Sequence, residues 1–308
     1  MDKKIKVAVL MGGKSPEHDV SMISGKEVVK QLDKNKYRVI PLPIPKSGKG
    51  IEGILKIKPD VVYIAMHGPF GEDGTVQGML DLFGIPYTGP GVLASSIGID
   101  KVMFRKIMVS ENIPIPKFVT FEKGESLKKV SSNLGKPSYF IKPYDQGSSV
   151  GASLVKQTKD LRSALNLALK YSQIALVDEY IEGIELTCAV LGNKNPIALP
   201  VIEIQALKGN FFDYKSKYTD KGALEIVPAR ISPELTKKVK EMAIKVYKAV
   251  GCKGVSRIDF ILKDGKYPIV LEINTSPGLT PASLLPKAAK AAGIDYSKLL
   301  DMIIGYAI

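Results

Sequence analysis

Polar side chains alternate with apolar ones along two neighbouring segments near the carboxyl end of the chain. Arg257 and Asp259 do so in VSRIDFILK (255–263), and Glu272 and Asn274 do so in YPIVLEIN (267–274). Because successive side chains of a strand point to opposite faces, the two members of each pair share a face. Two carboxylates and an amide oxygen suit a hard divalent cation such as Mg²⁺. A metal site is therefore predicted here, and a solvated polar face with an Arg257–Glu272 pair is the alternative.

The two segments are expected to form a hairpin, because Asp264-Gly265 between alternating apolar residues is typical of a tight turn. A turn centred on these two residues would pair residue 257 with 272 and residue 259 with 270. The carboxylates of Asp259 and Glu272 would then be diagonal neighbours.

Two loops elsewhere in the chain have the composition of ligand-binding segments. Residues 144–151 (YDQGSSVG) follow the strand-like YFIKP (139–143), and the backbone amides of such a Gly- and Ser-rich loop can hold a phosphate. The segment is not a Walker loop, since G-x-x-x-x-G-K-[ST] is absent. Residues 206–222 form a long polar and aromatic loop, a kind that is usually functional or mobile.

The first part of the chain must position these segments through an open parallel α/β unit. Strands are predicted at 5–11, 37–42 and 61–65, with helices at 19–32 and from Thr75, as N-cap, to Phe83. In such a unit, ligands bind at the carboxyl ends of the strands. The segment after the first strand, GGKSP (12–16), lacks the G-x-G-x-x-G spacing, so a dinucleotide site is disfavoured.

From about residue 100 the pattern changes to α+β. An amphipathic helix is predicted from Asp100-Lys101 to Ser110, and further helices at 124–133 and 158–170 precede a strand at 174–178. A long helix begins at Ser232-Pro233 and ends at Gly251, the hairpin follows, and two helices close the chain from about 282 and 295.

The composition fits an ordinary globular enzyme of 308 residues with 45% hydrophobic and 24% charged residues. The net charge of +13 is spread along the chain, which disfavours nucleic-acid binding and fits anionic substrates or a heat-adapted surface. Cys188 and Cys252 are expected to be buried thiols in a reducing compartment. The absence of a long apolar run predicts no membrane association, and the amino-terminal strand predicts a cytoplasmic location.

Five segments together resemble the D-alanine–D-alanine ligases, a family of ATP-grasp ligases. They are GGKSPEHDVSMISG (12–25), HGPFGEDGTVQGMLDLFGIPYTGPGV (67–92), IKPYDQGSSVG (141–151), FFDYKSKY (211–218), and RIDF (257–260) with LEINTSPGLTPASL (271–284). The resemblance spans essentially the whole chain. It implies a three-domain ATP-grasp architecture with an N-terminal α/β domain at 1–98, a central domain at 99–182, and a C-terminal domain at 183–308 that contains the mobile loop 206–222.

The implied reaction is ATP-dependent ligation of two D-alanine molecules through a D-alanyl phosphate, for peptidoglycan synthesis. The resemblance implies two Mg²⁺ ions, with Mn²⁺ as an alternative, held by Asp259, Glu272 and Asn274. The residues implied to bind ATP are Lys101, Lys142, Ser149 and Lys217 at the phosphates, Glu185 at the ribose, and Glu179, Tyr180 and Ile181 at the adenine.

On the substrate side, the resemblance implies that Glu17 pairs with the ammonium of the first D-alanine and is clasped by Ser148 and Tyr218. Arg257 and the N–H of Gly278 would stabilise the oxyanion. The residues implied to bind substrate besides these are His67, Lys217 and Ser283. Tyr218 favours D-alanine as the second substrate, and a homodimer through the N-terminal domain is implied. Another ATP-grasp carboxylate–amine ligase is the nearest alternative, and a basic nucleic-acid-binding protein is a more distant one.

Overall fold

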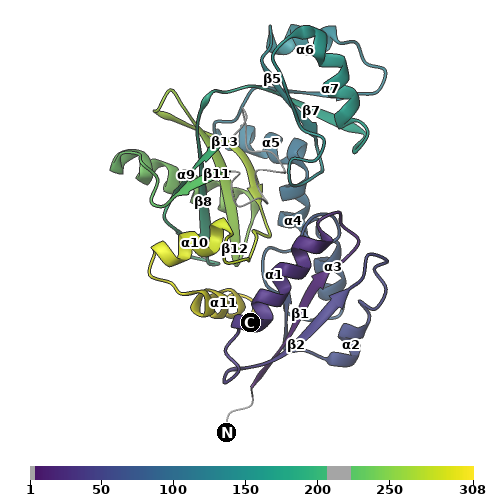
Figure 1. The fold of residues 1–308 in the computed structure, drawn as a ribbon, viewed down its shortest axis with the longest axis vertical. Helices are drawn as coiled ribbons and strands as arrows, with labels where there is room; N and C mark the ends of the chain where they lie inside the picture. Colours follow the sequence, from purple (N-terminus) through teal and green to yellow (C-terminus); the bar gives the residue numbers. More distant parts are fainter. Residues whose placement is uncertain (1–3, 207–222) are drawn as a thin grey trace.

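The computed structural model describes residues 4–206 and 223–308. Their strands form three sheets that follow one another along the long axis of the molecule (Figure 1). We call them the N-terminal sheet (order β2-β1-β3), the central sheet (β4-β7-β5-β6) and the C-terminal sheet (β11-β10-β8-β12-β13, with β9 beside β8). The N-terminal sheet is parallel and the other two are antiparallel. The predicted α/β unit followed by an α+β half is confirmed.

The N-terminal sheet is buried on both faces, as its continuous apolar strands predict. It contains β1 (Ile5–Gly12), β2 (Tyr37–Ile44) and β3 (Val61–Ile64). One face packs with α2 (Gly53–Ile57) and α3 (Thr75–Leu82), and the other with α1 (His18–Gln31), α10 (Leu284–Ala291) and α11 (Tyr296–Gly305). The carboxyl end of the chain thus returns to the amino-terminal part (Figure 1).

The start of α3 differs from the sequence prediction. Thr75 is the first helical residue and Gly74 is the N-cap, with φ +94°. The N–H of Thr75 donates to Asp73 Oδ1 at 2.9 Å. An Asp two residues upstream therefore takes the capping role that we assigned to the Thr75 hydroxyl, because the left-handed Gly74 turns the chain between them.

The central sheet consists of β4 (Phe118–Glu122), β5 (Tyr139–Pro143), β6 (Ser153–Val155) and β7 (Ile174–Glu179). One of its faces packs against α6 (Lys128–Leu134) and α7 (Leu161–Ala168), which follows the 3₁₀ turn η1 (Thr158–Asp160). Helix α6 begins four residues later than predicted. Strand alternation leaves Phe140, Lys142 and Asp178 on the opposite face.

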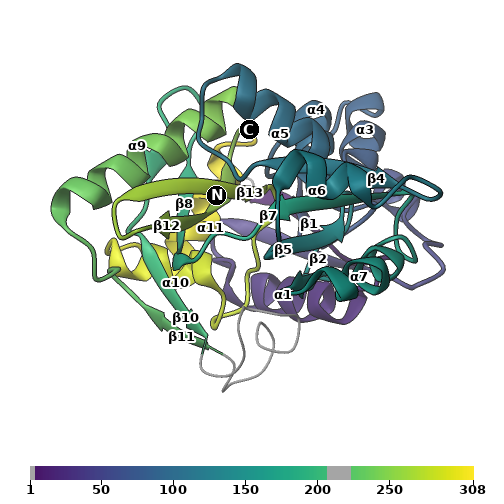
Figure 2. The same ribbon diagram turned by 90° about the horizontal axis from the view of Figure 1, so that it is seen from above.

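The C-terminal sheet contains β8 (Gly183–Leu191), β9 (Ile197–Ala198), β10 (Ile202–Ala206), β11 (Ala223–Ile226), β12 (Val255–Lys263) and β13 (Tyr267–Asn274). The long helix α9 (Pro233–Val250) covers one face, with help from α4 (Val92–Ile99) and α5 (Lys101–Ser110). Figure 2 shows α9 and α10 on opposite sides of this sheet. The predicted Ser232 cap and Gly251 stop of α9 are confirmed. Helix α5 begins at Lys101 as predicted, and Asp100 is its N-cap.

The β12–β13 register corrects our hairpin prediction. Residue 257 pairs with 274, and 259 with 272, instead of 257 with 272 and 259 with 270. The loop has three residues rather than two, because Lys263 pairs with Tyr267, and a bulge leaves Leu271 unpaired. The loop alone would move Glu272 to the other face. The bulge moves it back, so Asp259 and Glu272 lie directly opposite each other.

Candidate functional site

A cavity of about 550 Å³ lies between the C-terminal sheet and the face of the central sheet that carries Phe140, Lys142 and Asp178. We call it the inter-sheet cavity. Ten residues singled out from the sequence line it: Lys101, Lys142, Ser148, Ser149, Glu179, Tyr180, Ile181, Glu185, Asp259 and Glu272. The remaining predicted site residues lie elsewhere, and Lys217 and Tyr218, like the loop 206–222 apart from Ala206, are outside the described residues.

The floor of the cavity is a row of side chains on adjacent strands of the C-terminal sheet. Glu185 and Thr187 on β8 lie opposite Ile261 and Asp259 on β12, and Asp259 lies opposite Glu272 on β13. The other face of these strands is apolar and packs on α9. The alternation of the sequence thus separates a polar cavity face from a hydrophobic core face.

Asp259 is fixed by three donors. Arg257 donates from Nε to Oδ1 at 2.9 Å and from Nη2 to Oδ2 at 2.8 Å, and Thr187 Oγ1 donates to Oδ1 at 2.5 Å. Glu272 has Lys142 Nζ 4.0 Å from its Oε2. Asn274 Oδ1 accepts the N–H of Ser276 at 2.9 Å. Asp259 and Glu272 are therefore brought together as a carboxylate pair, and Asn274 follows on the same face.

The opposite wall, formed by the central sheet and the start of α5, carries two lysines. Lys142 Nζ lies 3.4 Å from Asp178 Oδ2, and Lys101 Nζ donates to the carbonyl of Gln146 at 2.6 Å. Both lysines are more than nine-tenths buried. No charge pattern in the sequence predicted that these two lysines would lie beside one cavity. Their burial there favours an anionic ligand.

The strand-to-strand segment 179–182 forms one end of the cavity. The N–H groups of Glu179 and Tyr180 donate to Lys117 O at 2.8 Å and Ser138 O at 3.0 Å. Among the described residues, no hydrogen bond is made by the N–H of Ile181. The N–H of Ile181 can therefore donate a hydrogen bond to a flat ligand that lies beside Tyr180 and Ile181.

A second set of site residues lies on loops where the three sheets meet, and we call it the loop junction. Ser148 Oγ donates to Glu17 Oε1, which joins the Gly- and Ser-rich loop to the start of α1. Ser148 and Ser149 both have left-handed backbones, with φ +49° and +58°. Gly68 is equally constrained, because a Cβ there would meet Ser15 Oγ at 2.3 Å and Glu17 Oε2 at 2.5 Å.

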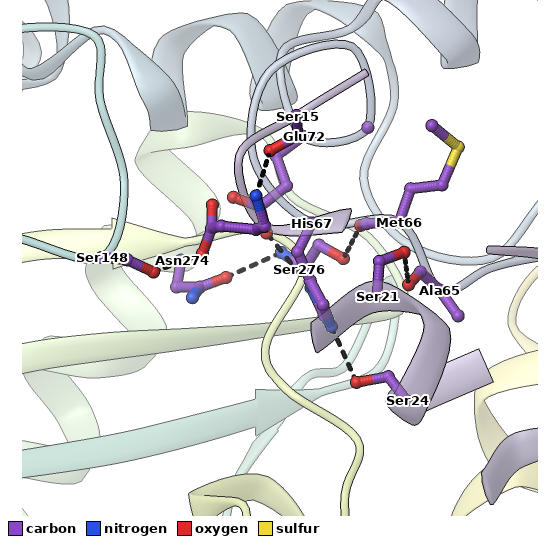
Figure 3. A network of polar contacts seen from close by, with 12 residues as sticks. Ser15, Ser21, Ser24, Ala65, Met66, His67, Glu72, Ser148, Asn274 and Ser276 are labelled. Atoms are coloured by element: carbon purple, nitrogen blue, oxygen red, sulfur yellow. Dashed lines mark hydrogen bonds and ion pairs between the residues drawn. The ribbon is translucent and has the colours of Figure 1, made fainter. Parts of the chain in front are cut away.

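His67 is the buried centre of the loop junction (Figure 3). Its Nε2 lies 2.9 Å from Ser24 Oγ and its Nδ1 lies 3.3 Å from Glu72 Oε1. Burial alone would lower the pKa of the imidazole, but the hydrogen bond to Glu72 and the charges of Glu72 and Glu17 outweigh burial and raise this pKa. His67 therefore holds its proton to a higher pH than a free imidazole would.

Ser276 and Ser283 close the loop junction from the C-terminal side. Ser276 Oγ donates to Met66 O at 3.2 Å (Figure 3). Ser283 precedes α10, and its Oγ accepts the N–H of Thr280 at 3.0 Å. A Cβ on Gly278 would meet this oxygen at 2.8 Å, so Gly278 and Ser283 lie in contact.

Residues around the cavity that the sequence analysis missed include Arg105, Phe140, Thr187 and Asp178. Asp178 directly follows the apolar run IALV, and Thr187 is a polar residue within a buried strand. These two features of the sequence could have identified Asp178 and Thr187 as candidate site residues. Within residues 4–206 and 223–308, no three His, Cys, Asp or Glu side chains cluster at metal-binding spacing. No helix in those ranges has the length and hydropathy needed to cross a membrane.

Comparisons with known proteins agree on one family. The family model described as D-ala D-ala ligase C-terminus matches residues 107–305, and the one described as D-ala D-ala ligase N-terminus matches residues 6–54 and 50–90. A D-alanine--D-alanine ligase of Pelotomaculum thermopropionicum is 40% identical, over 99% of this chain and 97% of that protein.

Two solved structures extend this likeness to the fold. The VanG D-Ala:D-Ser ligase from Enterococcus faecalis superposes with a TM-score of 0.88 at 34% identity, over 99% of this chain and 100% of that chain. The D-alanine--D-alanine ligase from Bacillus anthracis complexed with ATP gives a TM-score of 0.85 at 37% identity, over 98% and 97% of the two chains.

Proposed function

The chain belongs to the D-alanine–D-alanine ligase family, and on that premise we propose that it joins two D-alanine molecules at the expense of ATP. The γ-phosphoryl group of ATP passes to the carboxylate of the first D-alanine and gives a D-alanyl phosphate. The amine of the second D-alanine attacks the carbonyl, loses a proton, and phosphate leaves. The product is the D-alanyl-D-alanine of peptidoglycan precursors. This chemistry needs positioning and charge neutralisation more than an enzyme nucleophile.

The observation that supports this proposal best is the inter-sheet cavity itself. It combines buried lysines, a facing carboxylate pair and one unused backbone donor in a volume of about 550 Å³, which suits a nucleoside triphosphate. We assign Lys101, Lys142 and Ser149 to the phosphates, and Glu185 to the ribose. Residues 179–181 would line the adenine.

The carboxylate pair suits Mg²⁺ by the chemistry of its donors. Like charges placed directly opposite on two strands repel, and a divalent cation between them removes that repulsion. Asp259, Glu272 and the second lone pair of Asn274 Oδ1 would hold the ions, two Mg²⁺ in our proposal with Mn²⁺ as substitute. The bound metal would supply neutralisation of phosphate charge.

The loop junction supports the substrate side of the proposal. Glu17, nine-tenths buried and clasped by Ser148, offers a carboxylate for the ammonium of the first D-alanine. Arg257, held by Asp259, and the N–H of Gly278 are assigned to the oxyanion, and Ser283 beside Gly278 to the carboxylate of the second D-alanine. His67 is assigned to substrate orientation. Lys217 and Tyr218 keep their predicted roles as proposals, outside the described residues.

We also propose a homodimer through the N-terminal part of the chain. Helix α4 contacts both α3 and α5, and the three helices carry large apolar side chains that are exposed to solvent. Among these, Leu82 is 87% exposed and Leu93 is 72% exposed. Such side chains on adjoining helices are typical of a face covered by a second copy. We further propose that the domains meet at 98/99 and at 182/183. We also propose a cytoplasmic location, where ATP is available.

Phosphate release with D-alanine, ATP and Mg²⁺ tests the function, together with identification of the dipeptide product by mass spectrometry. We expect D-alanyl-D-alanine from D-alanine alone. A mixed D-alanyl-D-serine product from equimolar D-alanine and D-serine would move the protein towards the specificity in the name of the VanG relative. Failure to release phosphate with either amino acid would refute the proposal.

A further inference from the structure

Arg105 is a fully buried arginine behind the inter-sheet cavity, with none of its side chain exposed. It belongs to α5, an amphipathic helix whose charged residues would ordinarily face solvent. Its guanidinium divides between two acceptors on different sheets. Nη2 donates to Asp178 Oδ2 of the central sheet at 2.9 Å, and Nη1 donates to the carbonyl of Val270 in the C-terminal sheet at 2.9 Å.

The Asp178 contact controls the charge next to Lys142. Asp178 Oδ2 also lies 3.4 Å from Lys142 Nζ, so Arg105 and Lys142 share one carboxylate oxygen. With Arg105 in place, the three side chains carry a net charge of about +1 and Lys142 keeps its attraction for an anion. Without Arg105, Asp178 would neutralise Lys142 alone.

The Val270 contact controls the position of Glu272. Val270 lies on the edge strand β13, just before the bulged Leu271 that brings Glu272 opposite Asp259. Both backbone groups of Val270 on this open edge are used, because its N–H donates to Pro114 O at 2.8 Å and its C=O accepts from Arg105. The strand is therefore fixed at the residue from which the bulge starts.

Lys142 and Glu272 come from different sheets, and their side chains meet with Nζ and Oε2 4.0 Å apart. Arg105 hydrogen-bonds to a neighbour of each, namely to Asp178 beside Lys142 and to Val270 two residues before Glu272. We propose that Arg105 is a positioning residue that sets Lys142 and Glu272 against each other, and so shapes the site for the nucleotide phosphates. This inference rests on the assignment of the inter-sheet cavity to ATP.

The test compares Arg105→Lys and Arg105→Met with wild type. Lysine keeps the buried charge but has one nitrogen, which cannot span the two acceptors in the same planar fork. We expect the Kd for ADP with Mg²⁺, measured by calorimetry, and the KM for ATP to rise about 10-fold to 100-fold, the range typical of supporting residues. The KM for D-alanine should stay within about twofold, since these two hydrogen bonds of Arg105 go to Asp178 and Val270, outside the loop junction.

The matched control is Tyr247→Phe. It removes another buried hydrogen bond, from Tyr247 Oη to Gly192 O on the α9 side of the C-terminal sheet, away from the cavity lining. This variant should melt earlier than wild type and bind ADP unchanged. If Arg105→Lys behaves like this control, the positioning role is refuted.

Two further outcomes are separable. Should Arg105→Met not fold, Arg105→Lys still decides the question, and an ADP affinity within about twofold of wild type overturns the proposal. Should the wild-type protein bind ADP but release no phosphate with D-alanine, the proposed function fails while the comparison of ADP affinities remains valid. Wild-type ligase activity with an unaffected Arg105→Lys variant refutes only the role of Arg105.

Discussion

The inter-sheet cavity and the loop junction are built in different ways. In the cavity, Lys142, Asp178, Asp259 and Glu272 stand on strands, so their positions follow from sheet register. In the loop junction, residues such as His67 and Ser148 stand on loops, and buried side-chain hydrogen bonds hold them. A strand-built site resists local change, whereas a loop-built site depends on individual contacts between segments far apart in sequence.

The largest expected effect lies in the cavity. Glu272→Gln should lower kcat/KM by roughly 1,000-fold, because a carboxylate proposed to hold Mg²⁺ is lost. Its melting temperature should change little, since the lost repulsion from Asp259 and the lost attraction to Lys142, whose Nζ lies 4.0 Å from Oε2, oppose each other. A phosphate-release assay and a thermal melt measure both. Activity near wild type would show that the carboxylate pair does not hold the metal.

A smaller loss is expected in the loop junction. Ser148→Ala removes the hydroxyl that donates to buried Glu17 and should raise the KM for D-alanine about 10-fold to 100-fold. The matched control is Ser149→Ala, which removes the same group from the next residue with the same left-handed backbone. It should change the KM for ATP instead. Equal effects of both variants on the KM values for D-alanine and ATP would show that the loop junction and the inter-sheet cavity do not bind different substrates.

Thr187→Val probes how firmly the strand-built site is supported. The hydroxyl donates to Asp259 Oδ1 from a residue that is almost wholly buried. Valine keeps the shape, so we expect about a tenfold rise in the Mg²⁺ concentration needed for half-maximal rate, and Thr187→Ser should restore it. An unchanged Mg²⁺ requirement would mean that Arg257 alone orients Asp259.

The smallest expected effect is the pH dependence of His67. Its pKa in the folded protein is raised above the ordinary value of 6.5, so the stability it contributes is fully present below pH 6.5 and is lost as pH rises through the folded pKa. Melting temperatures of wild type and His67→Gln should therefore differ most at low pH and converge as pH rises. Glu72→Gln, which removes the main cause of the raised pKa, should flatten the wild-type curve. Parallel curves for wild type and His67→Gln would contradict the assignment.

The cavity was the part that sequence could predict. Alternation alone put Arg257, Asp259, Glu272 and Asn274 on one face, and the register error did not disturb that result because the loop and the bulge shift the pairing by two residues in total. The pairing partner itself was out of reach, since nothing in YPIVLEIN distinguishes a bulged leucine from a paired one.

The supports behind the sites were mostly not predictable. Arg105 appears as one more charged residue on an amphipathic helix, and only the approach of β13 and β7 makes it a buried bridge. His67 stands in a turn-rich segment whose partners, Ser24 and Glu72, come from both sides of it in sequence. Such contacts depend on tertiary packing, which local propensity and periodicity do not encode.

The extra turn residue and the bulged Leu271 both lie outside the pairing of Asp259 with Glu272. Lys263 pairs with Tyr267 across the turn, so deletion of Lys266 would leave a two-residue loop and the same register. Deletion of Leu271 would remove the bulge and join Val270 directly to Glu272, while their partners Phe260 and Asp259 stay the same. The hairpin therefore has two positions at which the chain can lose a residue without turning Glu272 away from the cavity.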